Sequence, residues 1–310
     1  MRIDATAAER FLASLDGEVP LERVWEHDAY DVVREHADLL GRDIAREDVE
    51  RGLSGEDTAF SGVADLPKNR DRVRSLLERV RSNEAAWTER IEAALKRVAP
   101  DEDHTDVTVF LGIGYDYGTG VGGERGAYLN LHAPLFRGAP REVLYTAAHE
   151  CSHVLHERVH RSRRALGPDS FEDPAGQRTV FDTVVHTEAF ATYTPIPLRR
   201  ADNGADESAS EHDNPVAEDY AVLSDDDRLA ELVATYDALR GSLGESAVPR
   251  DRLFTHLFGG QRLPYRVGTA ILTGLEAVRG IEAVREAFYC DPTEFTTEYD
   301  WVLDEYRSDA

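Results

Sequence analysis

Lysine is almost missing from this chain: Lys68 and Lys96 are its two lysines, and arginine supplies nearly all of the positive charge. The 60 acidic residues outnumber the 35 basic ones, which leaves a formal net charge of -25 at pH 7. Such a surface repels nucleic acid and anionic membranes. It is suited to high salt, where like-charge repulsion is screened within a few ångströms. We therefore interpret the composition as that of a halophile; an ordinary acidic cytosolic protein is the alternative.

Cysteine is equally scarce. Cys151 and Cys290 form no CxxC pair and cannot build a disulfide framework, which excludes the disulfide-rich secreted class. Cys151 falls in a predicted helix, about 160° around from His153, so we expect a small buried residue and not a ligand.

Long apolar runs are also lacking. None approaches the ~20 residues that a membrane-spanning helix needs, and charges interrupt the N-terminal segment where a signal peptide has its apolar core. Residues 115–126 ("YDYGTGVGGERG") contain no Gly-Lys-Ser/Thr and open no helix, so we interpret them as a flexible loop and not a phosphate site. The expectation is a cytoplasmic protein with no membrane or nucleic-acid partner, of undetermined oligomeric state.

The order of the predicted elements indicates an α+β protein that is mostly helical. Apolar residues at three- and four-residue spacing predict an N-terminal helical region over residues 1–105. A second region, 106–310, opens with strand candidates at 106–114 and 127–136. Acidic, turn-rich residues 201–227 predict a partly mobile surface excursion within it.

Two helices are expected between these strands and the excursion. The first begins near Pro140, at the first-turn position that proline prefers, and ends near Gly167. The second runs from about Gln177 to Thr194 and is stopped by "PIP".

The first of these helices carries histidines at positions 149, 153, 156 and 160. Gaps of four, three and four residues return each side chain to the same helix face. His149, Glu150 and His153 form the pattern HExxH. His160 lies about 16 Å along the axis from His149 at ~1.5 Å per residue, too far to share an ion. His156, a turn beyond the pair, is expected to pack or to reach the rim of the site.

The HExxH spacing has a chemical reason. Two histidines one turn apart on a rigid helix converge on one zinc ion, which lowers the pKa of a bound water towards ~7. Glu150, turned about 100° from His149, is placed to take the proton and deliver it to a leaving group. A surface helix that happens to carry histidines is the alternative.

A catalytic zinc site needs a third protein ligand and one open position. One stripe of the second helix is apolar apart from Glu188; it consists of Phe181, Val184, Val185, Glu188 and Thr192. A buried carboxylate is costly unless it is paired or binds metal. His186 and Asp182 point about 160° and 120° away from Glu188. The helical wheel therefore favours Glu188 as the ligand; a glutamate paired with a core arginine is the alternative.

"HECSH" followed by "TEAFATY" resembles the glutamate-type zincins, the gluzincin metallopeptidases, over roughly residues 106–300. The chain is also similar to a group of predicted zinc-dependent proteases in which the second helix reads like E-G-L-A. The resemblance implies a zincin-like region, with a small antiparallel or mixed sheet beside the HExxH helix, and Zn²⁺ held by His149, His153 and Glu188. One departure is that Glu188 follows His153 by 35 positions, more than in the best-known members.

The resemblance also implies a role for Tyr265 in "LPYRVGTAIL". In several of these families a tyrosine at this place faces the metal and hydrogen-bonds the developing oxyanion. Arg266 then binds a substrate carboxylate or caps a neighbour. A tyrosine at the edge of the core is the alternative for Tyr265.

These features predict a zinc-dependent metallopeptidase with Glu150 as general base. A peptide or protein substrate is expected to lie along the strand at 127–136 by main-chain hydrogen bonds. A zinc hydrolase of a non-peptide amide or ester is a second hypothesis, since fold and motif do not fix the substrate. A non-catalytic zinc-site protein is a third; Glu150 argues against it, because a structural zinc site needs no base.

Overall fold

The computed structural model describes residues 1–120, 126–202, 215–243 and 245–307. It confirms a mostly helical α+β protein with a small mixed sheet. Over the described ranges the sheet has four strands, in the order β1 (Arg2–Asp4), β2 (Thr108–Gly112), β4 (Gly126–Asn130) and β3 (Gly118–Thr119). The first three are parallel, and β3 runs antiparallel to β4. Arg2 pairs with Thr108, so the sheet crosses the boundary predicted between residues 105 and 106.

The predicted strand at 127–136 is too long. β4 ends at Asn130, and Pro134–Phe136 form a 3₁₀ turn, η2, because proline cannot donate to a ladder. β4 is also not an edge strand, since β2 and β3 flank it. The edge strand beside β4 is β3, which lies inside the segment interpreted as a flexible loop. Residues 121–125 of that segment lie outside the described residues.

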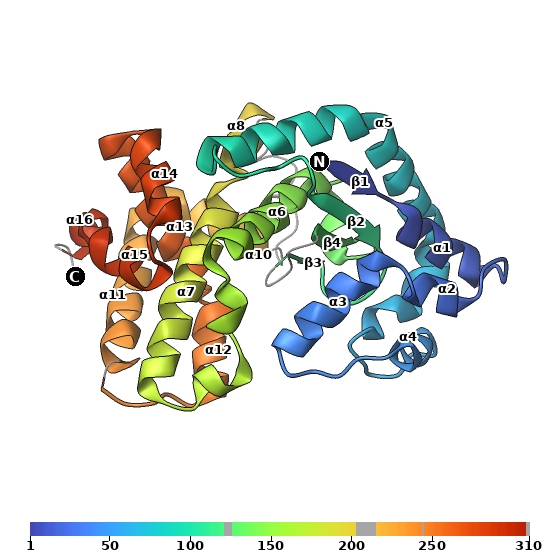
Figure 1. Ribbon diagram of the computed structural model, residues 1–310, viewed down its shortest axis with the longest axis horizontal. Helices are drawn as coiled ribbons and strands as arrows, with labels where there is room; N and C mark the ends of the chain where they lie inside the picture. Colours follow the sequence, from blue (N-terminus) through green and yellow to red (C-terminus); the bar gives the residue numbers. More distant parts are fainter. Residues whose placement is uncertain (121–125, 203–214, 244, 308–310) are drawn as a thin grey trace.

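The N-terminal helices lie around the sheet, at the right of Figure 1, with the long α5 running over the top. They are α1 (Thr6–Leu15), α2 (Leu21–Trp25), α3 (Asp28–Leu39), α4 (Arg46–Leu53), η1 (Ser61–Asp65) and α5 (Leu66–Val98). Leu66 and the Pro67 that follows it open α5, where a proline costs no hydrogen bond.

The helices that follow the sheet begin with α6 (Glu142–His160), η3 (Ser162–Arg164), η4 (Pro168–Phe171), α7 (Pro174–Tyr193) and α8 (Ile196–Ala201). They continue with α10 (Pro215–Ala221), η5 (Val222–Ser224), α11 (Asp226–Leu243), α12 (Arg250–Phe258), α13 (Leu263–Arg279), α14 (Ile281–Tyr289), α15 (Pro292–Glu298), η6 (Asp300–Leu303) and α16 (Asp304–Arg307). Among the described helices, none combines the length and apolar character of a membrane span.

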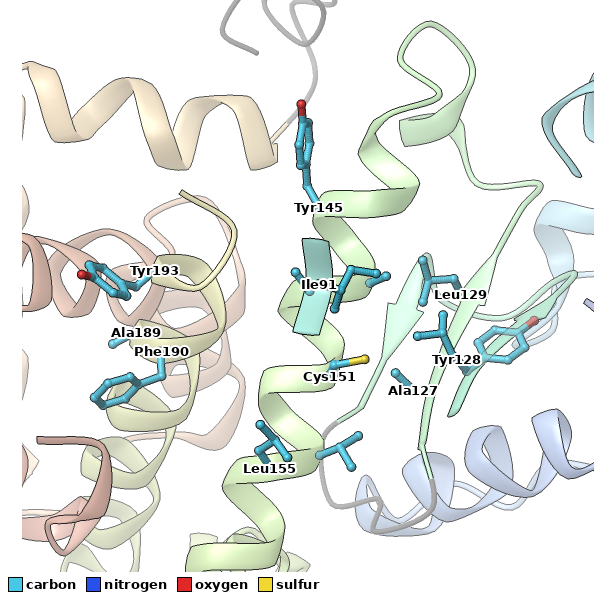
Figure 2. Close-up of a cluster of buried hydrophobic side chains, with 14 of the residues drawn as sticks. Ile91, Ala127, Tyr128, Leu129, Tyr145, Cys151, Leu155, Ala189, Phe190 and Tyr193 are labelled. Carbon is cyan, nitrogen blue, oxygen red and sulfur yellow. The ribbon is translucent and has the colours of Figure 1, made fainter. Parts of the chain in front are cut away.

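Helix α6 runs between the sheet and α7 (Figure 1). Cys151 lies on its sheet side near Ala127 and Leu129, while Phe190 lies across on α7 (Figure 2). Cys151 is fully buried, as its position on the helical wheel predicted. The helix ends at His160 and not near Gly167, because Arg161 takes the left-handed conformation with φ 52°.

Of the predicted surface excursion at 201–227, residues 203–214 lie outside the described residues. Residues 215–221 form α10, and its Asp219 is 2% exposed. Arg262 and Arg266 donate to this carboxylate at 2.8 and 2.9 Å. A buried carboxylate needs such partners, and composition alone cannot reveal them. Arg266 is thus the cap of a neighbour and not a ligand for substrate.

The net charge of -25 predicts a fold that depends on salt. Repulsion between the acidic side chains reaches ~30 Å at 0.01 M salt but only ~3 Å at 1 M. We expect the melting temperature to climb steeply as KCl is raised over this range, measured by circular dichroism. A flat curve would contradict the halophile interpretation.

Candidate metal centre

Three predicted ligands converge between α6 and α7. His149 and His153 lie one turn apart on α6, and their Nε2 atoms are 3.2 Å apart. Glu188 enters from α7 with Oε2 3.5 Å from His149 Nε2 and 3.4 Å from His153 Nε2. The three donor atoms therefore surround one point, as a single ion requires.

The donor set fits a zinc ion. Two ligand atoms about 2.0–2.2 Å from tetrahedral zinc lie roughly 3.3–3.6 Å from each other, close to the separations found here. Glu188 is 3% exposed, and its Oε2 has no hydrogen-bond partner among the described residues. A buried oxygen of this kind is costly unless a cation or donor meets it.

Thr187 orients one of the imidazoles. Its hydroxyl oxygen lies 3.0 Å from Nδ1 of His153, in the interface between α6 and α7. A hydrogen bond at Nδ1 fixes the ring and leaves Nε2 directed at Glu188, an arrangement common around ligating histidines.

The charges of these three side chains depend on one another. Burial lowers the pKa of His149 to about 4. Burial alone would raise the pKa of Glu188, but His153 and His149 hold it well below its ordinary value. In turn Glu188 outweighs burial and raises the pKa of His153. The site thus favours a Glu188 carboxylate beside one protonated imidazole, and a metal cation can take the place of that proton.

Glu150 lies against the edge strand β3 and is 4% exposed. Burial, assisted by the Glu188 and Asp116 carboxylates, raises its pKa to about 8. A Cβ on Gly118 would stand 2.7 Å from Oε1 of Glu150, and one on Gly120 would stand 2.1 Å from its carbonyl oxygen. At position 120 only glycine permits this approach, because a Cβ there would meet the backbone of α6. The "GTG" that we read as loop flexibility is in fact the signal of a strand packed on the acid.

Tyr265, at the start of α13, lines the same cleft. Its ring is nearly parallel to that of His149, with an interplanar angle of 4° and centroids 6.3 Å apart. The Arg262 guanidinium lies over the Tyr265 ring, 3.6 Å from its centroid, and donates a hydrogen bond to Asp219. The sequence offered no signal for Arg262, because its role depends on residues far apart in the chain.

The cleft has a volume of about 320 Å³. Elements from both halves of the chain form it: α3, β3, α6, α7, α12 and α13. Besides the residues above, its lining includes His36, Arg42, Tyr117, Phe171, Arg250 and Phe254. The cleft of this very acidic protein therefore carries arginines and aromatic rings next to the carboxylates.

The other polar residues weighed as ligands lie away from this point. Asp182 accepts from Arg178 and from Thr296. His156 and His160 gather with His186 on the other flank of α7. The structure therefore places Glu188, and none of these, against the HExxH pair.

Comparison of the chain with protein-family models, with curated proteins and with solved structures finds no match.

Proposed function

We propose that this protein is a zinc-dependent metallohydrolase of the gluzincin type that hydrolyses peptide bonds. The observation that carries the proposal is the convergence of one Glu188 oxygen, which has no hydrogen bond, on the Nε2 atoms of His149 and His153, in the cleft that the buried Glu150 also lines. A structural zinc site has no use for the buried acid, whereas hydrolysis needs a base beside the metal.

Each group has a chemical role in this proposal. His149, His153 and Glu188 would hold a zinc ion, which would supply Lewis acidity for the scissile carbonyl and for the attacking water. Glu150 accepts a proton from that water and passes it to the leaving amine. The hydroxyl of Tyr265 donates a hydrogen bond to the oxygen of the carbonyl as negative charge develops there. The burial of Glu150 and Glu188 strengthens these interactions.

The position of β3 supports a peptide substrate. Its Gly118 and Thr119 pair with β4 on one side and line the cleft beside Glu150. An extended peptide can add to such an edge by main-chain hydrogen bonds. The sequence had predicted that the substrate binds along the strand at 127–136. That strand lies inside the sheet, so we assign substrate binding to β3.

The proposal is tested with metal-free protein, prepared by chelation in high salt and then reloaded with zinc. Each form is incubated with a mixed peptide library, and new termini are identified by mass spectrometry. We expect cleavage from the zinc-loaded protein alone. Cleavage of ester or non-peptide amide substrates without peptide cleavage would favour the second hypothesis, and zinc uptake with no hydrolysis would favour a non-catalytic site.

Tyr265→Phe tests the role of the hydroxyl. We expect kcat to fall roughly 10²–10³-fold, the usual effect of losing one oxyanion donor, with zinc content and KM nearly unchanged. Tyr193→Phe is the matched control, since it removes a hydroxyl that bonds Glu276 away from the cleft. A wild-type kcat in Tyr265→Phe would leave Tyr265 as a packing residue.

A further inference from the structure

A second histidine cluster lies two turns beyond the first on α6. His156 and His160 repeat the four-residue spacing of His149 and His153 exactly seven positions later, so all four lie on one face of the helix. His186 joins the second pair from α7, and one ring nitrogen from each of the three lies within 4.8 Å of the others.

The arrangement follows from how α7 packs on α6. Thr187 points at α6 and contacts His153, so the residues before and after it flank the contact on opposite sides. Glu188 reaches the first histidine pair from one flank, and His186 reaches the second pair from the other.

Carbonyl groups at the end of α14 fix the protons of this cluster. His186 Nε2 lies 2.9 Å from the carbonyl oxygen of Ala287, and His160 Nε2 lies 2.7 Å from that of Phe288. A carbonyl only accepts, so both Nε2 atoms carry hydrogen and both Nδ1 atoms of these neutral rings carry lone pairs. His156 Nε2, 2.7 Å from His186 Nδ1, is then the donor to it.

The cluster is left with more lone pairs than donors. Nδ1 of His156 is buried and has no hydrogen-bond partner within the described residues, and the whole side chain is 0% exposed. A buried nitrogen without a partner is unfavourable. It is also the position to which the Nε2 proton of this ring can move, which frees the Nε2 lone pair for a cation.

We infer that His156, His160 and His186 form a second metal site, for a divalent transition ion such as zinc. Three imidazoles suit zinc, cobalt, nickel or copper ions and not magnesium or calcium. Ligating histidines commonly donate their other N–H to a backbone carbonyl, as His186 and His160 do here.

Binding would replace the hydrogen bond between His156 and His186. The two nitrogens, now 2.7 Å apart, must separate to roughly 3.3 Å to share a tetrahedral ion. Cys290 lies outside the ligand set, because its sulfur is 3.9 Å from Nε2 of His186, the nitrogen already bonded to Ala287.

The second site differs from the first in position and in consequence. The three histidines are absent from the residues that line the cleft, and no carboxylate joins them in the described part of the chain. The ion would link α6 and α7 and, through the two carbonyls, α14. Its effect is therefore on the stability of the helical layer, and the inference holds or fails independently of the proposed hydrolysis.

The test counts zinc by mass spectrometry in protein that has been incubated with ZnCl₂ and desalted. We expect two equivalents in the wild type, one in Glu188→Ala and one in His160→Ala, with none in the double variant. His160→Gln, which keeps an N–H for the Phe288 carbonyl, should also hold one. One equivalent in the wild type and none in Glu188→Ala would overturn the inference.

A second measurement starts from a variant that keeps all three histidines of the second site. Zinc added to Glu188→Ala should raise its melting temperature, because a ligand that binds the native state stabilises it. The rise should disappear in Glu188→Ala/His160→Gln. An unchanged melting temperature of Glu188→Ala over micromolar to millimolar zinc would also overturn the second site.

Discussion

Glu150→Gln is expected to keep its zinc and to lower kcat by roughly 10²–10⁴-fold, the range for removal of a general base. The amide has nearly the shape of the carboxylate but cannot accept the proton. Since Glu150 is not one of the groups that converge on a point with His149, His153 and Glu188, its loss should not remove a ligand. Turnover of the peptides found in the library and zinc content are measured on the same sample.

Glu157→Gln is the matched control for this variant. Glu157 lies on the same helix and is equally buried, but it accepts from the Ser162 hydroxyl and the Arg163 backbone N–H, which an amide oxygen can replace. It should turn over like the wild type. Near-normal kcat in Glu150→Gln would show that the base is another group or that the chemistry is different.

Glu150→Gln should also change the pH dependence of zinc binding. With its pKa raised to about 8, Glu150 carries a proton in the metal-free protein at neutral pH. A cation close by favours the carboxylate, so zinc uptake releases that proton and the affinity rises with pH up to about 8. In Glu150→Gln this contribution is absent, and calorimetry below pH 8 should find fewer protons released. Equal proton release in both proteins would contradict the raised pKa.

Glu188→Ala is expected to weaken zinc binding at the first site by more than ~100-fold. Loss of a residue that only supports a ligand costs up to ~100-fold in metal affinity, and Glu188 is itself a ligand in the proposal. Only the two histidine ligands remain, and a protonated His153 loses the Glu188 carboxylate as its counter-ion. Hydrolysis should be lost with the metal. The affinity is measured by competition with a chelator of known strength, in molar KCl so that the fold is fully screened.

Asp182→Asn serves as the control for Glu188→Ala. It alters a buried carboxylate six positions earlier on α7, whose partners are Arg178 and Thr296 and not the histidine pair. This change should affect stability and leave the zinc affinity of the first site as it was. If Glu188→Ala instead retains wild-type affinity there, the gluzincin assignment is wrong even where the hydrolysis survives.

Local spacing made part of this protein predictable. The helices around the histidines and Glu188 follow from apolar residues at three- and four-residue spacing, and the face shared by His149 and His153 follows from the helical repeat. Burial of Cys151 follows from the same angles. Such features depend on residues within a few turns of one another, so the sequence is sufficient for them.

Short strands and buried ion pairs were not predictable in this way. β1 has three residues and β3 two, too few to show any alternation, and each exists because a partner strand lies beside it. Asp219 appeared to belong to an acidic surface segment, yet Arg262 and Arg266 bury it.

By itself the sequence determined which side chains share a helix face, because the angle between two residues of one helix depends only on their separation. The wheel thus set Glu188 and His186 on nearly opposite sides of α7. The tertiary structure alone decided what lies on each side. Helix α7 packs on α6 through Thr187. Glu188, on one side of Thr187, therefore reaches the pair His149 and His153, and His186, on its other side, reaches the pair His156 and His160. Packing between helices depends on every contact along both of them, and no spacing within one helix contains that information.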